Sequence, residues 1–253
     1  MKRILITGAA SGIGRATATL FARNGWTVGL LDVNNDALVS LSDELAGAWY
    51  QRLDVTSHSD CIEACEAFAE AHDGLDVLFN CAGILRMGAF EDIAADQHAQ
   101  IINVNVNGLM NMSLAALPHL KKGDQPAVIN MSSASALYGT PDFASYSASK
   151  FAVRGLTEAL NIEWERQGIR VVDIMPPFVK TPMLDEAEYR APVVDRLGVN
   201  LSADDIAGEV YKAANGPTPV HNPVGGLFRL MTLMDKVLPS RSTKWTMSWL
   251  SRH

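Results

Sequence analysis

The chain has 253 residues, of which 48% are hydrophobic, and a formal net charge of −7. This length suits one α/β domain with a full core, and the acidic balance gives no basic footprint for nucleic acid. No apolar run is long enough to span a bilayer, and the first predicted strand begins too close to the start for a signal peptide. We therefore expect a cytoplasmic protein.

An apolar run near the start leads directly into a glycine-rich turn. Residues 4–6 (Ile-Leu-Ile) precede the sequence TGAASGIG, and an apolar helical pattern then continues to Asn24 and Gly25. A strand, a glycine turn and a helix start hold a pyrophosphate through backbone N–H groups and the positive end of the helix. The spacing G-x-x-x-G-x-G differs from the general dinucleotide fingerprint, and a simple tight turn is the alternative interpretation.

The second predicted strand, residues 26–32, ends in an acid. Asp32 follows Gly14 by eighteen residues, near the separation expected for a carboxylate that binds an adenosine ribose. Such a carboxylate accepts hydrogen bonds from both ribose hydroxyls, and it repels a 2′-phosphate by about 4 kcal/mol at ~4 Å and a dielectric of ~20. Neither Ala10 nor Ser11 is basic, so NAD is favoured over NADP. Alternatively, Asp32 only caps the next helix.

Further strand-like runs alternate with helical stretches along the rest of the chain. They lie at residues 77–79, 127–130 and 171–174. This alternation predicts an α/β fold, a Rossmann-type doubly wound parallel sheet in a single domain over residues 1–253.

The cysteines and histidines give no metal signal. Cys61 and Cys65 are four residues apart on a predicted helix, but a disulfide or metal site lacks the C-x-x-C spacing and a second ligand pair. We expect both to be reduced and half-buried. The six histidines are scattered without ligand spacing, and we expect surface or loop positions for all of them.

A tyrosine and a lysine in the sequence YSASK form a candidate acid–base pair. Tyr146 and Lys150 share one face if the segment is helical. Bringing the tyrosine pKa from ~10 to ~7 needs about 4 kcal/mol, and a positive charge ~4–5 Å away supplies roughly 3–4 kcal/mol at a dielectric of ~20. The pair therefore suits proton transfer to and from an alcohol oxygen. An ordinary helix-surface pair is the alternative.

Together these motifs resemble the classical short-chain dehydrogenase/reductase family over residues 2 to 185. The resemblance also rests on Asp54-Val55 after the third strand, on the Asn80-Cys81-Ala82-Gly83 turn, on Asn105 in an NVNG sequence, and on Ser133. It implies that Tyr146 is the acid–base group and that Lys150 lowers its pKa and holds the nicotinamide ribose. Ser133 would bind the substrate oxygen, and Asn105 would organise a water that links Lys150 to solvent.

The resemblance implies a cofactor site as well, with Asp54 contacting adenine and Asn80 bracing the sheet. The predicted catalytic residues are Asn105, Ser133, Tyr146 and Lys150. The predicted cofactor-binding residues are Gly8, Ser11, Gly12, Ile13, Gly14, Asp32, Asp54, Val55, Asn80, Ala82, Gly83, Tyr146, Lys150, Pro176, Val179 and Thr181. No metal site is predicted.

Two positions depart from the family pattern. Pro177 stands where the family usually has glycine, and its missing N–H and fixed φ change the backbone contacts available near the nicotinamide. Cys81 replaces the commoner asparagine, and we infer no redox role for it. Residues 182–202 are similar to the family's mobile substrate lid.

The C-terminal segment, residues 225–253, differs most from the family. An apolar stripe at helical spacing runs through residues 227–238, and Trp245 and Trp249 follow. Three interpretations stay open: a helix packed on its own domain or a sister subunit, a lid over an apolar substrate pocket, and a membrane-surface helix. The basic residues of that third interpretation are Arg229, Lys236, Arg241, Lys244 and Arg252.

The resemblance and the residues together predict an NAD-dependent oxidoreductase that interconverts a secondary alcohol and a ketone, on a fairly apolar substrate. A catalytically silent NAD-sensing protein and a nucleotide-sugar epimerase or dehydratase are the alternatives. The family resemblance implies a homodimer or a homotetramer.

Overall fold

The computed structural model describes residues 1–185, 189–235 and 248–251. Seven parallel strands form one sheet in the order β3-β2-β1-β4-β5-β6-β9. The chain runs outward from β1 to β3, then returns to the other side of β1 for β4, so the order reverses between β1 and β4. The strands are β1 (Arg3–Thr7), β2 (Thr27–Asp32), β3 (Trp49–Arg52), β4 (Val77–Asn80), β5 (Ala127–Met131), β6 (Arg170–Met175) and β9 (His221–Pro223).

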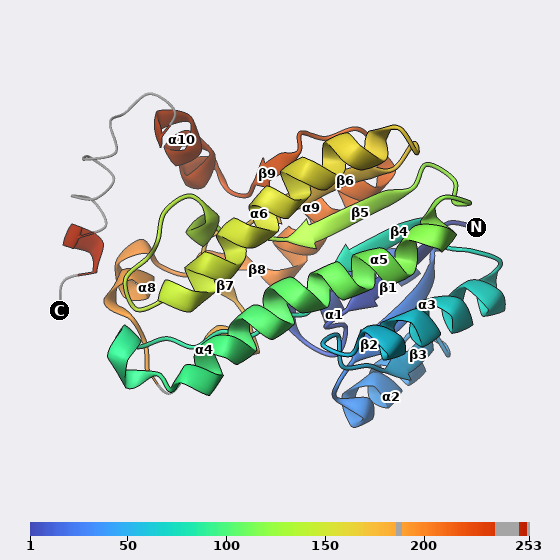
Figure 1. Cartoon of the computed structure of the whole chain (residues 1–253), viewed down its shortest axis with the longest axis horizontal. Coiled ribbons are helices and arrows are strands. Elements are labelled where there is room, and N and C mark those ends of the chain that lie inside the picture. The colour runs from blue at the N-terminus through green and yellow to red at the C-terminus, as the bar shows by residue number, and fades with distance from the viewer. Residues whose placement is uncertain (186–188, 236–247, 252–253) are drawn as a thin grey trace.

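Helices cover both faces of this sheet (Figure 1). Side chains alternate across a strand, so Ile4 and Ile6 join the core beneath one helical layer while Leu5 joins the core beneath the other. The first layer contains α1 (Gly12–Arg23), α2 (Asn35–Glu44) and α9 (Ala203–Asn215), and the second contains α3 (His58–His72), α5 (Gly108–Leu120) and α6 (Ala144–Glu165). Burial on both faces explains why the strands are continuous apolar runs. The predicted doubly wound α/β fold is confirmed.

Short elements surround the carboxyl ends of the strands. Helix α4 (Ala95–Ile102) continues through a π-helical segment, η2 (Asn103–Asn107), into α5, and the single-turn segments η1 (Phe90–Asp92) and η3 (Ala134–Ala136) lie in neighbouring loops. The predicted lid contains α7 (Pro182–Asp185) and α8 (Pro192–Leu197). Its end, β8 (Leu201–Ser202), pairs in parallel with β7 (Val179–Lys180), which follows β6.

The described part of the C-terminal segment contains one longer helix, α10 (Gly226–Asp235), which projects from the sheet edge beyond β9 (Figure 1). Phe228 packs with Ala136 and Met175, and further along the chain Leu250 packs against the lid residues Val193 and Val194. Trp245 and the basic residues at 236, 241, 244 and 252 lie outside the described residues.

Two predictions about single residues are wrong. Cys61 and Cys65 are fully buried on α3, not half-buried, and burial raises the pKa of each thiol to about 12. His221 is no plain surface histidine, because Nδ1 lies 2.9 Å from Asp173 Oδ2 and Nε2 lies 2.9 Å from Glu158 Oε1. Among the described residues no group of three His, Cys, Asp or Glu side chains could hold a metal ion.

Candidate active site

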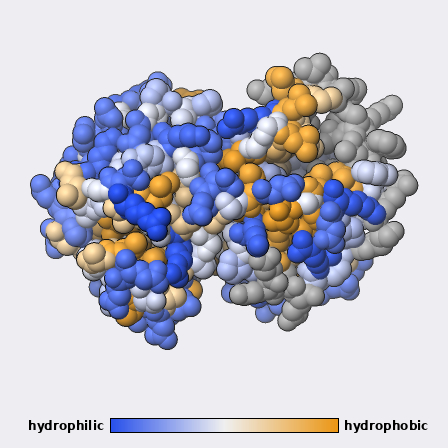
Figure 2. All heavy atoms as spheres, turned by 180° about the vertical axis from the view of Figure 1, so that it is seen from behind, coloured by the Kyte–Doolittle hydropathy of each residue, from blue (hydrophilic) through white to orange (hydrophobic). Residues whose placement is uncertain are grey.

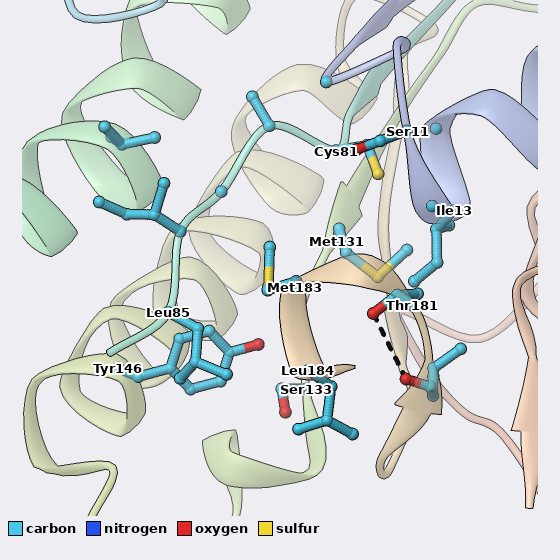
Figure 3. Close-up of a pocket in the computed structure, with 18 of the residues that line it drawn as sticks. Ser11, Ile13, Cys81, Leu85, Met131, Ser133, Tyr146, Thr181, Met183 and Leu184 are labelled. Atoms are coloured by element: carbon cyan, nitrogen blue, oxygen red, sulfur yellow. Dashed lines mark hydrogen bonds between the residues drawn. The ribbon is translucent and has the colours of Figure 1, made fainter. Parts of the chain in front are cut away.

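A cavity of about 420 Å³, here called the cofactor cavity, lies at the carboxyl ends of the parallel strands. This edge of an open α/β sheet is where ligands bind, at the point where the strand order reverses. Figure 3 shows Tyr146 and Ser133 on one side of the cavity and Ser11 and Ile13 on the other. The predicted residues that line it are Gly8, Ser11, Gly12, Ile13, Gly14, Asp32, Asp54, Val55, Ala82, Gly83, Ser133, Tyr146, Lys150, Pro176, Val179 and Thr181.

The glycine turn has the shape that a pyrophosphate requires. Gly8 and Gly12 have positive φ values of 66° and 50°, which favour glycine, and a Cβ on Gly8 would lie 2.9 Å from the Ala82 backbone. Helix α1 starts at Gly12 with no acidic side chain in its first turn and no side-chain cap from Ser11. Its first N–H groups are therefore available to an anion.

Asp32 is held at the end of β2 by backbone donors. The Ala10 N–H donates to Oδ2 and the Asn34 N–H donates to Oδ1, each at 3.0 Å. The alternative that Asp32 caps the next helix is not what the structure shows, because Asn34 accepts the capping bond from Ala37. The carboxylate therefore stands at the cavity wall, where an adenosine ribose would lie next to β2.

Tyr146 and Ser133 come from different elements and meet in the cavity. Tyr146 lies in the first turns of α6, and Ser133 follows β5 and accepts a hydrogen bond from the Ser135 N–H at 3.2 Å. Burial raises the pKa of the Tyr146 phenol to about 12, and a hydrogen bond with Ser133 opposes that shift. The phenol is thus protonated at neutral pH in the free chain.

Lys150 stands one turn after Tyr146, as the sequence predicts, and is buried. Its Nζ donates to the Met131 carbonyl at 2.8 Å and lies 5.4 Å from the centroid of the Tyr146 ring. Burial lowers the pKa of the ammonium to about 8. The predicted lowering of the Tyr146 pKa is therefore absent from the free chain, because burial of the phenol outweighs the hydrogen bond with Ser133.

Asn80 and Asn105 lie outside the lining of the cofactor cavity and act on the backbone behind it. Asn80 Nδ2 donates to Ser113 Oγ and to Asn130 Oδ1, each at 3.0 Å, which ties β4 to α5 and β5. Asn105 lies in η2, where it accepts from the Ile84 N–H at 2.8 Å. A Cβ on Gly83 would lie 3.2 Å from Asn105 Oδ1 and 3.9 Å from Lys150 Nζ, so Asn105 holds this turn against the lysine.

A second cavity, of about 520 Å³, adjoins the first and is here called the apolar cavity. The two share Ser133, Ser135, Pro177 and Phe178. Its walls come from the loop after β5, from α8 and from α10. No charged side chain is among the described residues that line it. The aliphatic and phenylalanine residues that it does not share with the cofactor cavity are Ala134, Leu137, Val193, Leu197, Leu201, Val224, Leu227, Phe228, Met231 and Met234.

Several lining residues were not predicted from the sequence. Leu85, Met183 and Leu184 lie around Tyr146 (Figure 3), and Phe178 packs near Phe143, with 5.9 Å between ring centroids. Each is an ordinary apolar residue in a loop or short helix. Two sequence signals were available: Phe178 follows the departure at Pro177, and Met183 and Leu184 lie in the predicted lid, residues 182–202.

The cofactor cavity fits an oxidised or reduced nicotinamide dinucleotide, because Gly8 and the start of α1 leave backbone N–H groups for the pyrophosphate and Asp32 stands where the ribose would lie. The doubly wound sheet and this cavity together define a dinucleotide-binding α/β protein.

Comparison with known proteins narrows that class. The profile described as short chain dehydrogenase matches residues 2–191. The 3-alpha-(or 20-beta)-hydroxysteroid dehydrogenase of Mycobacterium bovis is 37% identical over 185 residues, which cover 73% of this chain and 71% of that protein. The chain belongs to the short-chain dehydrogenase/reductase family, and is accordingly an oxidoreductase that binds NAD or NADP.

Two solved structures have the same fold. A short chain dehydrogenase/reductase from Burkholderia phymatum in complex with NAD is 29% identical with a TM-score of 0.76, covering 84% of this chain and 85% of that chain. An alcohol dehydrogenase from Thermococcus sibiricus complexed with 5-hydroxy-NADP is 25% identical with a TM-score of 0.77, covering 88% and 95%. The relatives therefore include binders of both forms of the cofactor.

Proposed function

We propose that this protein interconverts a bulky, uncharged secondary alcohol and its ketone, with NAD as the cofactor. The observation that carries the proposal is the position of Ser133 at the junction of two cavities. The cofactor cavity on one side holds Tyr146 and Lys150, and the apolar cavity on the other has no charged lining among the described residues. A carbinol at that junction places its apolar body away from water.

Side chains of the protein transfer the hydroxyl proton of the substrate and stabilise its oxygen. Tyr146 takes the hydroxyl proton in oxidation as the phenolate, a form that the positive charges of Lys150 and of bound oxidised nicotinamide would favour, and it returns the proton in reduction. Ser133 donates a hydrogen bond to the oxygen as negative charge develops there. Bound nicotinamide supplies the acceptor or donor of the hydride on the carbinol carbon. Lys150, fixed by Met131, would bind the ribose of that cofactor. Asn105 positions the Ile84 backbone nearby, and Asn80 ties β4 to β5 through the Asn130 side chain.

The choice of NAD is supported by the electrostatics around Asp32. A 2′-phosphate beside this carboxylate would bring like charges together at a cost of about 4 kcal/mol at ~4 Å. The described residues that line the cofactor cavity include two acids, Asp32 and Asp54, and the single base Lys150, which serves the opposite end. The Burkholderia phymatum relative was solved with NAD.

The size and chemistry of the apolar cavity support the substrate class. A ligand pocket that is mostly apolar with a few convergent hydroxyls binds a largely hydrophobic small molecule. The Mycobacterium bovis relative is named for hydroxysteroids, which are bulky secondary alcohols of this kind. Exposed apolar side chains at Leu114 on α5 and Ile162 on α6 support the proposed homodimer or homotetramer.

Turnover by the purified protein tests this function. Formation of reduced cofactor is measured with NAD and with NADP across secondary alcohols that range from small and polar to polycyclic and apolar. We expect turnover with NAD and a kcat/KM that rises with apolar bulk. Cofactor binding without turnover of any alcohol or ketone would contradict the proposed reaction, and a preference for small polar alcohols would contradict the proposed substrate class.

A further inference from the structure

Helix α10 carries more apolar side chains than its own domain covers. Phe228 is 7% exposed and fills the space between Ala136 and Met175. In contrast, Leu227 is 69% exposed, Leu230 53%, Leu233 62% and Met234 47%. Figure 2 shows apolar side chains gathered over this helix. Leu227 and Met234 also line the apolar cavity, so the name outer face of α10 is kept here for Leu230 and Leu233.

The sequence around this face has the opposite charge to the remainder of the chain. Residues 226–253 contain five of the 21 Lys and Arg residues and one of the 28 Asp and Glu residues, which gives a net charge of +4. Residues 1–225 carry −11. Within the described part, Arg229 lies on α10 beside the outer face, and Nη2 is 3.6 Å from Glu209 Oε2. Along the sequence, a positively charged segment therefore follows the exposed apolar residues of α10.

We propose that the outer face of α10 docks on an anionic membrane surface. An amphipathic helix with exposed leucines and a basic surrounding sequence binds at the lipid interface through its apolar area and its attraction to anionic headgroups. The helix lies on the surface and does not cross it, because no described helix is long and apolar enough to span a bilayer. The strongly acidic remainder is repelled by the same headgroups, which orients the molecule with α10 towards the lipid.

Charge also distinguishes this occupant from a second copy of the chain. A twofold contact would set the outer face of one copy against the outer face of the other. Each copy carries a net charge of +4 over residues 226–253, and like charges on the two copies oppose such a contact. An anionic surface has the complementary charge, so it fits the segment better than a sister subunit does. The proposal goes beyond the oxidoreductase activity and does not depend on it.

Vesicle co-sedimentation tests the docking with the full chain. The probes are vesicles of phosphatidylcholine alone and of phosphatidylcholine mixed equally with phosphatidylglycerol. The test variant is Leu230→Gln with Leu233→Gln, because neither residue lines the cofactor cavity or the apolar cavity. The matched control is Val39→Gln with Ile62→Gln, since these apolar side chains are also exposed, on α2 and α3, and line neither cavity.

We expect the wild-type chain to sediment with the anionic vesicles at least about tenfold more strongly than with the neutral ones. The test variant should lose about tenfold in binding to anionic vesicles, while the control keeps it. Raising the salt from about 0.1 M to about 1 M should weaken binding, because the Debye length falls from about 10 Å to about 3 Å. Thermal unfolding of each variant confirms that it is folded.

Light scattering of the same samples distinguishes docking on a membrane from a contact with a second copy of the chain. A test variant that loses vesicle binding at an unchanged solution mass supports the proposal. Absence of binding to anionic vesicles by the wild-type chain overturns it. Full retention of vesicle binding by the test variant also overturns it. A test variant whose only change is a smaller oligomer overturns it as well, and would assign the outer face to a contact with a second copy.

Discussion

The two cavities that meet at Ser133 are built by different means. The cofactor cavity is shaped by backbone, with glycines at positive φ, a helix start and carboxylates held by N–H donors. The apolar cavity is shaped by leucine, valine and methionine side chains that come from three distant segments. The residues of the cofactor cavity lie in short sequence motifs. Those of the apolar cavity come together only in the folded chain. Reaction chemistry and substrate choice are therefore separately variable in this protein.

The largest expected effect concerns the chemistry at the junction. Tyr146→Phe should reduce kcat by about a thousandfold or more, because the reacting oxygen loses its proton acceptor. Cofactor affinity should change less than about threefold, since the ring that lines the cavity stays in place. Stopped-flow turnover and cofactor titration measure the two quantities. Tyr211→Phe, away from both cavities, is the control, and a parallel loss of cofactor affinity would assign Tyr146 to binding.

Asp32→Ala tests whether a single carboxylate in the cofactor cavity sets the preference for NAD over NADP. Removal of the charge should raise kcat/KM with NADP relative to NAD by about tenfold to a hundredfold, since up to about 4 kcal/mol of repulsion disappears. Asp32→Asn isolates the charge, because its side-chain oxygen can still accept from Ala10 or Asn34. Asp36→Ala on α2 is the exposed control. An unchanged cofactor ratio in both Asp32 variants would remove this residue from cofactor choice.

Met231→Trp tests the substrate side alone. A larger ring on α10 reduces the apolar cavity, so kcat/KM for polycyclic alcohols should fall by about tenfold while small alcohols are unaffected. Cofactor affinity should stay the same, because Met231 does not line the cofactor cavity. Thr232→Val, on the same helix but outside the lining, serves as control. Equal losses of kcat/KM for small and large alcohols would mean that the apolar cavity does not select the substrate separately from the cofactor cavity.

The smallest expected effect is on stability at the edge where β9 leads to α10. Asp173 raises the pKa of His221, and burial raises the pKa of Asp173. The ion pair therefore stabilises the fold below the ordinary histidine pKa of about 6.5, is lost as the pH rises through the raised value, and is also lost when Asp173 takes up a proton in acid.

His221→Asn should cost about 1 kcal/mol in the free energy of unfolding near pH ~6 and less near pH ~9. Urea unfolding at the two pH values measures the difference. His58→Asn, exposed at the start of α3, should show no such dependence. A cost for His221→Asn that is the same at both pH values would indicate a packing contribution in place of the ion pair.

The sequence predicted the cofactor side better than the substrate side for a physical reason. Gly8, Asp32, Ser133 and Tyr146 each follow or begin an element whose hydrophobic period is readable, and the parallel sheet places those ends together. Burial is not readable in the same way, so the raised pKa of Tyr146 and the complete burial of Cys61 were missed.

Long-range contacts at the edge of the sheet were missed as well. His221 is 48 residues from Asp173 and 63 from Glu158 along the chain. The sequence around each of the three residues does not predict that contact. The π-helical segment around Asn105 was also unforeseen, because its residues have the composition of an ordinary polar helix start.

The pairing of β7 with β8 has a consequence for the order of events. Val179, which lines the cofactor cavity, is hydrogen-bonded in register with Leu201, which lines the apolar cavity at the end of the lid. We therefore expect a dinucleotide that fixes the backbone around Val179 to fix the end of the predicted lid as well. Steady-state kinetics should accordingly be compulsory-ordered, with the dinucleotide first on and last off, and its departure should limit the turnover of good substrates.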